Sequence, residues 1–129
     1  MRAWRLGTIA ALMAVVSVAA FAEYDKATMQ KVMQNNLADL PKLSAAADAA
    51  RYMEAAGYLL SIAQGMYSIR EYTPLKGDNA AWDQTITAFL ATAFRGLAAC
   101  ADENQAGLKA AVTELVKLRN QGHAAFRPY

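Results

Sequence analysis

The chain has 129 residues, with 13 Lys+Arg against 11 Asp+Glu, one cysteine and one histidine. This length supports one domain built around one hydrophobic core. A lone cysteine excludes an internal disulfide framework, and one histidine with one cysteine excludes the usual zinc sites.

Residues 1–22 have the pattern of a cleavable signal peptide. Two arginines precede an apolar stretch, which ends in the small-x-small sequence Ala20-Phe21-Ala22 that signal peptidases recognise. The apolar stretch is shorter than the roughly 20 residues that span a bilayer. We therefore expect export to the periplasm, with cleavage after Ala22.

Cleavage would leave residues 23–129 as a single domain with balanced charge. The removed segment carries Arg2 and Arg5, so 11 basic residues would face 11 acidic ones. No basic stripe and no interleaving of aromatic and basic residues remain in this part of the sequence. We therefore expect no nucleic-acid partner, and no membrane partner after signal cleavage.

The first two predicted elements are helices over residues 24–40 and 44–72. Apolar residues recur at three- and four-residue spacing, and no sustained alternation indicates a strand. Pro41 is expected to end the first helix and Ser44 to cap the start of the second. The inward positions predicted for the first helix are Met29, Val32, Met33, Leu37 and Leu40.

The next two predicted helices cover residues 80–101 and 105–126. The Pro- and Gly-containing segment 73–79 separates them from the second helix, and Asp102-Glu103-Asn104 marks the start of the last one. The predicted inward stripe of the third helix is Trp82, Ile86, Phe89, Ala93, Leu97 and Cys100. That of the fourth helix is Leu108, Val112, Leu115, Leu118, Gly122 and Phe126.

Four amphipathic helices with mostly short links predict an all-α fold, an antiparallel up-down-up-down four-helix bundle. The first predicted helix is shorter than the others, so one end of the bundle is expected to be less covered. The second helix is rich in small residues, which allow close packing within a monomer or between the subunits of a homodimer.

The only histidine, His123, lies between Arg119 and Arg127 at four-residue spacing, so all three share one helix face. In an antiparallel bundle, Met29 or Met33 of the first helix would lie at the same end as His123. A thioether and an imidazole can ligate haem iron axially, and arginines can pair with its propionates. Alternatively, the methionines fill the core and the histidine interacts with the helix dipole.

The segment RNQGHAAFR, residues 119–127, resembles the C-terminal helix of the soluble periplasmic cytochrome b562 class. The matching positions are Arg119, Asn120, His123, Phe126 and Arg127. The same frame resembles cytochrome c′, but Arg119 and Gly122 stand where its haem-attachment cysteines would be. The resemblance implies non-covalent haem b, held by His123 and a methionine, with no c-type attachment. It also implies electron transfer with a redox protein partner.

The methionine ligand is less well defined by this resemblance. In that family, apolar residues follow the distal haem ligand three, seven and ten positions later. Met33, Leu37 and Leu40 match this spacing if Gln30 occupies the position of the distal ligand. Met29 is then one residue away, a rotation of about 100°. Three outcomes follow: six-coordinate iron with a methionine, five-coordinate iron with an open face, or a bundle without haem.

We expect a binding or electron-transfer protein rather than an enzyme, since the sequence has no P-loop, GxGxxG or GxSxG motif. The leading hypothesis is a periplasmic haem b bundle for electron transfer or small-gas binding. The alternative is a haem-free exported binding or interaction module, with its His123 end filled by Tyr24, Met66 and Phe126. Copper(I) handling by methionines and His123 is a third hypothesis, weakened by their dispersal along the sequence.

Overall fold

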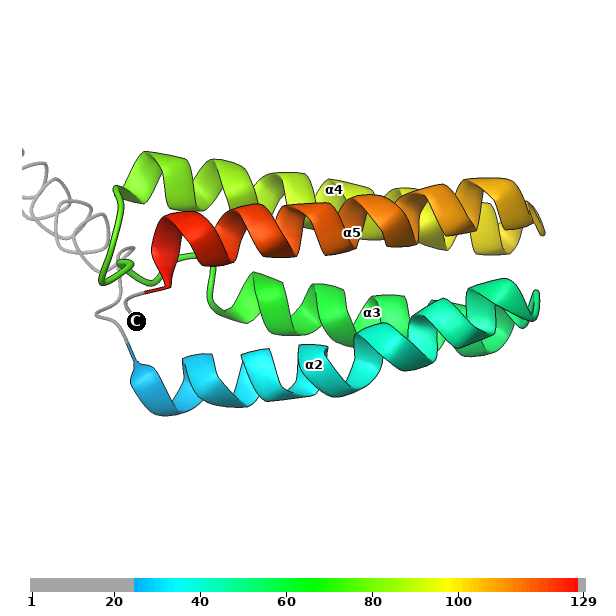
Figure 1. Cartoon of the computed structure of the whole chain (residues 1–129), viewed down its shortest axis with the longest axis horizontal. Coiled ribbons are helices and arrows are strands. Elements are labelled where there is room, and N and C mark those ends of the chain that lie inside the picture. The colour runs from blue at the N-terminus through cyan, green and yellow to red at the C-terminus, as the bar shows by residue number, and fades with distance from the viewer. Residues whose placement is uncertain (1–24, 128–129) are drawn as a thin grey trace, which may run out of the picture.

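The computed structural model describes residues 25–127, so the predicted signal peptide, residues 1–22, lies outside the described part of the chain. Four helices occupy most of it: α2 (Lys26–Asp48), α3 (Tyr52–Ser68), α4 (Asn79–Ala101) and α5 (Gln105–Phe126). Consecutive helices pack antiparallel, and α5 also packs against α2 (Figure 1), which confirms the predicted four-helix bundle. None of these four helices is both long enough and apolar enough to cross a membrane.

The starts of α4 and α5 are fixed by local side-chain chemistry. The Asp78 carboxylate accepts a hydrogen bond from the Ala81 amide at 2.7 Å. The Asn104 side chain accepts one from the Gly107 amide at 3.0 Å. Each bond satisfies an amide that has no partner within the helix. The helices predicted over residues 80–101 and 105–126 are confirmed to within one residue.

The predicted boundary at Pro41 is wrong, because α2 continues through this proline to Asp48. Proline removes the amide that would bond the carbonyl of Leu37. Both Leu37 and Pro41 are exposed, so water can satisfy that carbonyl. Ser44 therefore lies inside α2 and caps nothing, and α2 (23 residues) is longer than α3 (17 residues).

The actual break lies at Ala50, which adopts the left-handed conformation with a φ of 54°. The Arg51 amide donates to the Ala46 carbonyl at 2.9 Å, and the Ala50 amide to the Ala47 carbonyl at 3.2 Å. This is the Schellman pattern that closes a helix C-terminus. α4 ends in the same way at Glu103, whose φ is 50°.

α3 ends at Ser68, earlier than the predicted residue 72, and residues 69–78 connect it to α4. Gly77 in this connection has a φ of 82°. A Cβ atom at this position would lie only 2.8 Å from ring atoms of Phe126. Glycine thus permits both the backbone conformation and the close packing of this connection on the end of α5.

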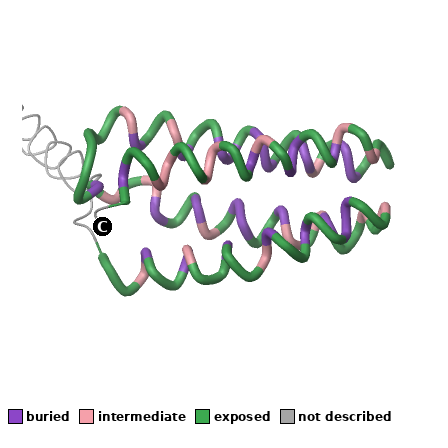
Figure 2. The backbone as a smooth tube through the Cα atoms, in the orientation of Figure 1, coloured by how far each residue is buried: buried purple, intermediate pink, exposed green. Residues whose placement is uncertain are grey.

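The core lies between the inward faces of the helices, with exposed positions on the outside (Figure 2). The predicted inward positions of α4 and α5 are buried except for the half-buried Leu97, Leu118 and Gly122. Cys100 is buried as predicted, and this burial raises the pKa of its thiol. In α2 the prediction for Leu37 is wrong, because 61% of this residue is exposed.

Candidate functional site

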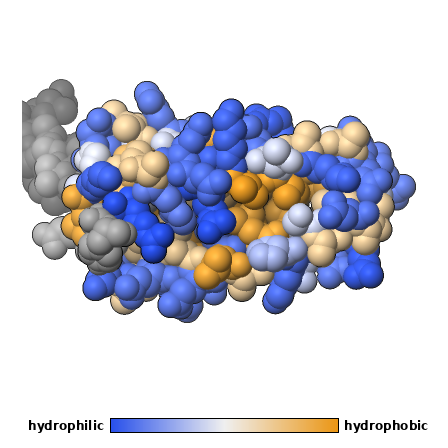
Figure 3. Space-filling view, viewed as in Figure 1, coloured by the Kyte–Doolittle hydropathy of each residue, from blue (hydrophilic) through white to orange (hydrophobic). Residues whose placement is uncertain are grey.

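A cavity of about 530 Å³ lies between the first half of α2 and the second half of α5. These are the halves that diverge in Figure 1. The volume falls within the range of about 300–1,000 Å³ typical of small-molecule sites. Figure 3 shows apolar side chains in the middle of the face that carries α5 and α2, with strongly hydrophilic ones nearer the end of α5. The bundle therefore has room for a mainly apolar ligand at this end.

All six residues predicted to form a site line this cavity. They are Met29 and Met33 from α2, Arg119, His123 and Phe126 from α5, and Arg127, which directly follows α5. Met66, on α3, also lines the cavity rather than filling it. Tyr24, the third residue expected to fill this end in the haem-free alternative, lies outside the described residues. The structure thus brings the predicted residues together and leaves space between them.

Contacts at the opposite end of the bundle set the height of Met29 relative to His123. The Gln105 side-chain amide donates to the Ala47 carbonyl at 3.1 Å, which fixes the register of α2 against α5. Met29 precedes Ala47 by 18 residues, and His123 follows Gln105 by 18 residues. Each interval corresponds to about 27 Å of helix. The backbone of Met29 therefore lies at a similar height to that of His123, and the backbone of Met33 lies one turn deeper.

The face of α2 that points inward is not the one that would place Gln30 in the position of the distal haem ligand. Met29 is only 7% exposed, whereas Gln30 is exposed at the rim of the cavity. The buried positions Met29, Val32, Asn36 and Leu40 follow helical spacing and define this phase. In this phase Met29, and not Gln30, occupies the inward position.

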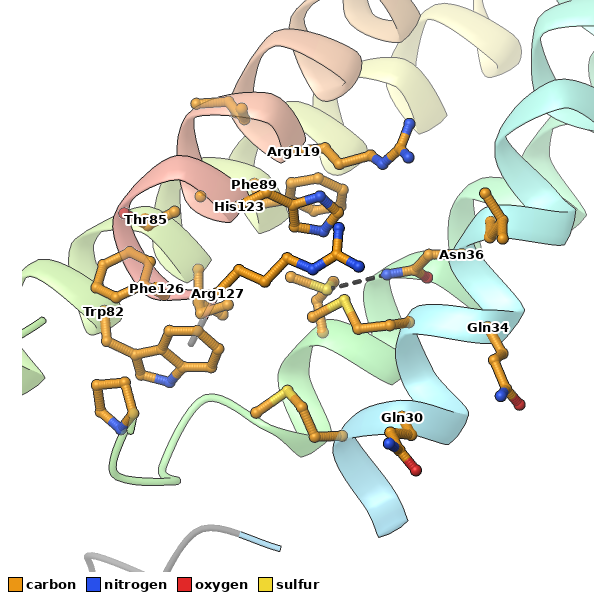
Figure 4. Close-up of a pocket in the computed structure, with 18 of the residues that line it drawn as sticks. Gln30, Gln34, Asn36, Trp82, Thr85, Phe89, Arg119, His123, Phe126 and Arg127 are labelled. Atoms are coloured by element: carbon orange, nitrogen blue, oxygen red, sulfur yellow. Dashed lines mark hydrogen bonds between the residues drawn. The ribbon is translucent and has the colours of Figure 1, made fainter. Parts of the chain in front are cut away.

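His123 lies in an environment that favours its neutral form. Burial lowers the pKa of its imidazole below 6.5, and the positive charges of Arg119 and Arg127 lower it further. A neutral imidazole keeps one nitrogen lone pair available to a metal. Figure 4 shows His123 and Arg127 projecting from α5 toward the space beside α2. Among the described lining residues, these two arginines are the only ones with a permanent charge.

Asn36 is a cavity residue that the sequence pattern did not identify. It is only 7% exposed, and its side-chain amide donates to the Met66 sulfur at 3.1 Å (Figure 4). A thioether is a weak acceptor, so this is a modest partner for a buried amide. The available signal was its four-residue spacing from Val32 and Leu40, which its polar side chain obscured.

An aromatic pair anchors the last turn of α5. The rings of Trp82 and Phe126 meet edge to face with centroids 5.2 Å apart. The Trp82 indole donates to the Ile69 carbonyl at 3.1 Å, which ties the pair to the 69–78 connection. The Lys76 ammonium group donates to the Ala124 carbonyl at 3.2 Å, near the end of α5. These contacts hold the turn that carries the site histidine.

Within residues 25–127, no cluster of three or more His, Cys, Asp or Glu side chains could hold a metal ion. A metal bound by these residues would therefore need other donors, either those of a cofactor or the thioethers in the cavity.

Comparisons with protein-family models, curated proteins and solved structures find no match. The fold and the cavity define a four-helix bundle with a candidate ligand site between its first and last described helices. Its function must therefore be inferred from the chemistry of the cavity.

Proposed function

We propose that this protein is an exported, periplasmic haem b protein that binds its cofactor non-covalently between α2 and α5. One observation carries the proposal. His123 and Met29 line one cavity from opposite helices at similar heights, and Arg119 and Arg127 line it on either side of the histidine. Imidazole and thioether are the axial ligands of many cytochromes.

The chemistry of the cavity lining supports haem b as the ligand. Apolar and aromatic side chains form much of its wall and suit the porphyrin face. Guanidinium groups pair with carboxylates through two parallel hydrogen bonds, so the arginines suit the propionates. Bound haem would supply iron for one-electron transfer or gas binding, while the chain orients it and limits access of water.

Met29 is the proposed second axial ligand. It is buried and its backbone lies at a similar height to that of His123, whereas Met33 is half-buried and its backbone is one turn deeper. With Met29 on the iron, the protein would exchange electrons with a redox protein partner. If His123 alone held the iron, bound haem would supply a site for a small gas.

Non-covalent retention is proposed because the c-type attachment frame holds Arg119 and Gly122 in place of cysteines. No thioether bond to the porphyrin can form at these positions. Extraction with acidified organic solvent should therefore remove the cofactor completely. A haem that stays with the denatured chain would contradict this part of the proposal.

The test is a hemin titration of residues 23–129, followed by visible spectra of the oxidised and reduced protein. We expect one haem per chain, with narrow reduced α and β bands if a methionine is the second ligand. Broad high-spin bands would indicate His123 alone. Failure to take up stoichiometric haem would overturn the proposal and favour the haem-free binding module.

Variants assign the ligands. His123→Gln should abolish stoichiometric uptake, and Met29→Leu should retain haem but convert it to the high-spin form. Met53→Leu is the matched control, since Met53 is 88% exposed and should leave the spectrum unchanged. If Met33→Leu gives the high-spin form and Met29→Leu does not, the ligand is Met33.

A further inference from the structure

Three methionine sulfurs share the cavity with the only imidazole in the chain. Met29, Met33 and Met66 all line it, although 37 residues separate the first from the last in sequence. Met29 and Met33 are four residues apart on α2, so their side chains lie one above the other on one helix face. His123 faces them from α5 at a similar height. The dispersal that weakened the copper hypothesis at the sequence level is therefore absent in the fold.

We propose that the haem-free protein binds one Cu(I) ion through the sulfurs of Met29 and Met33 and the imidazole of His123. Thioethers are soft ligands that select Cu(I), and imidazole is also a good copper ligand. Three neutral donors from two facing helices would give a mononuclear site. This proposal does not depend on haem binding, because it concerns the chain without haem.

Met66 is excluded from the proposed ligand set. Its sulfur already accepts the hydrogen bond from the buried Asn36 amide at 3.1 Å. Asn36 lies seven residues, or about two turns, beyond Met29 along α2. Met66 is therefore engaged by Asn36 and is left out of the proposed ligand set.

Charge in the cavity favours a monovalent ion over a divalent one. No carboxylate lines the described cavity, and the flanking Arg119 and Arg127 repel any cation. Coulomb repulsion is about twice as strong for a divalent ion at the same distance. Divalent ions such as Mg²⁺ and Ca²⁺ also prefer carboxylate oxygens, which the cavity lacks. We expect Cu(I) to bind and Zn(II) not to bind.

Copper and haem would compete, since both use the His123 imidazole. A chain loaded with Cu(I) should take up hemin only as the copper leaves. The cavity would then hold either a soft metal ion or a porphyrin.

The test is an anaerobic competition for Cu(I) against bicinchoninate, using residues 23–129 with Cys100→Ala so that the thiol does not contribute. We expect one Cu(I) per chain. The Met29→Leu/Met33→Leu double variant and His123→Gln should each weaken Cu(I) binding at least about tenfold. Removing a residue that only hydrogen-bonds a metal ligand already costs about that much affinity in other metal sites. Met53→Leu should bind as the parent does, since Met53 is 88% exposed.

A second measurement does not depend on the folding of the ligand variants. Ag(I), a diamagnetic analogue of Cu(I), should shift the methyl NMR signals of Met29 and Met33 and leave that of the exposed Met53 in place. No copper uptake, equal uptake by the ligand variants, or shifts confined to Met53 or Met66 would each overturn the proposal.

Discussion

At His123, burial and two neighbouring positive charges act in the same direction. Each of them disfavours the imidazolium form, with burial the largest cause and Arg119 and Arg127 adding to it. Sequence spacing predicted that both arginines share a helix face with His123. It did not predict the partial burial of the imidazole, which depends on the surrounding cavity wall. The combination favours the neutral imidazole at neutral pH.

This environment makes the stability of the haem-free protein depend on pH. The unfolded chain takes up a proton on His123 near its ordinary pKa of 6.5, whereas the folded chain does so only at lower pH. Since the unfolded state binds more protons in this window, the free energy of unfolding should rise with pH through it. Urea unfolding between about pH 5 and pH 7.5 measures the effect.

The control for the pH experiment is His123→Gln, which should give a flatter profile than the parent over the same window. Removing Arg119 with Arg119→Gln should raise the imidazole pKa and give an intermediate slope. Identical profiles for parent and His123→Gln would contradict the lowered pKa.

Asn36 is a polar residue at a core position, and its burial should reduce stability. The Met66 thioether that accepts its hydrogen bond is a weak acceptor, so leaving this sulfur without a donor costs little free energy. Asn36→Leu should therefore raise the free energy of unfolding by about 0.5–1 kcal/mol. Leu37→Asn, at the exposed neighbouring position, should change it by less than about 0.5 kcal/mol. Urea midpoints in the opposite order would place Leu37, and not Asn36, on the inward face.

At the level of the helices, the sequence predicted boundaries where the signal is a local side chain. Asp78 and Asn104 mark the starts of α4 and α5 because a carboxylate or amide bonds a nearby backbone amide. The break between α2 and α3 has no such signal, since Ala50 adopts a conformation usually given to glycine. Pro41 wrongly predicted a helix end, because a proline at an exposed helix position is tolerated when tertiary packing stabilises the helix before and after it.

The left-handed conformation of Ala50 is costly for a residue with a Cβ atom. Ala50→Gly should raise the free energy of unfolding by about 1 kcal/mol, the low end of the penalty for this conformation. Ala45→Gly, at an exposed position inside α2, should lower it by about as much. Chemical denaturation of both variants measures this difference. A loss of stability in both would contradict the helix end at Ala50.

Pro41 links the shape of α2 to the cavity. Figure 1 shows α2 changing direction along its length, and a proline inside a helix is a common cause of such a bend. Pro41→Ala should raise the free energy of unfolding by about 2 kcal/mol. Alanine is much more favourable than proline inside a helix, and this gain exceeds the loss from giving the unfolded chain more conformational freedom. It should also weaken hemin binding, because a straighter α2 brings its first half closer to α5.

The matched control for Pro41→Ala is Lys42→Ala at the next, exposed position, which should change neither stability nor hemin binding appreciably. A gain in stability without any loss of hemin affinity would show that the bend is not needed for the site.

At the level of the whole molecule, topology alone brings the ends of the first and last described helices together. That is why Met29, Met33 and His123 could be predicted as a group from the helix patterns of two distant segments. The cavity itself could not be predicted, because it depends on how far α2 and α5 diverge. The same reason hid Asn36, whose contact with Met66 follows from the phase of α2 and its packing against α3.

Haem binding to the folded chain alone should stabilise the whole bundle by mass action. Free hemin at one hundred times its Kd should add about 2.7 kcal/mol to the free energy of unfolding. For a domain of this size, that corresponds to a rise in Tm of roughly 10–20 °C. Thermal unfolding followed by circular dichroism measures the shift. His123→Gln should show a much smaller rise at the same hemin concentration, and an equal rise would indicate binding that does not use the imidazole.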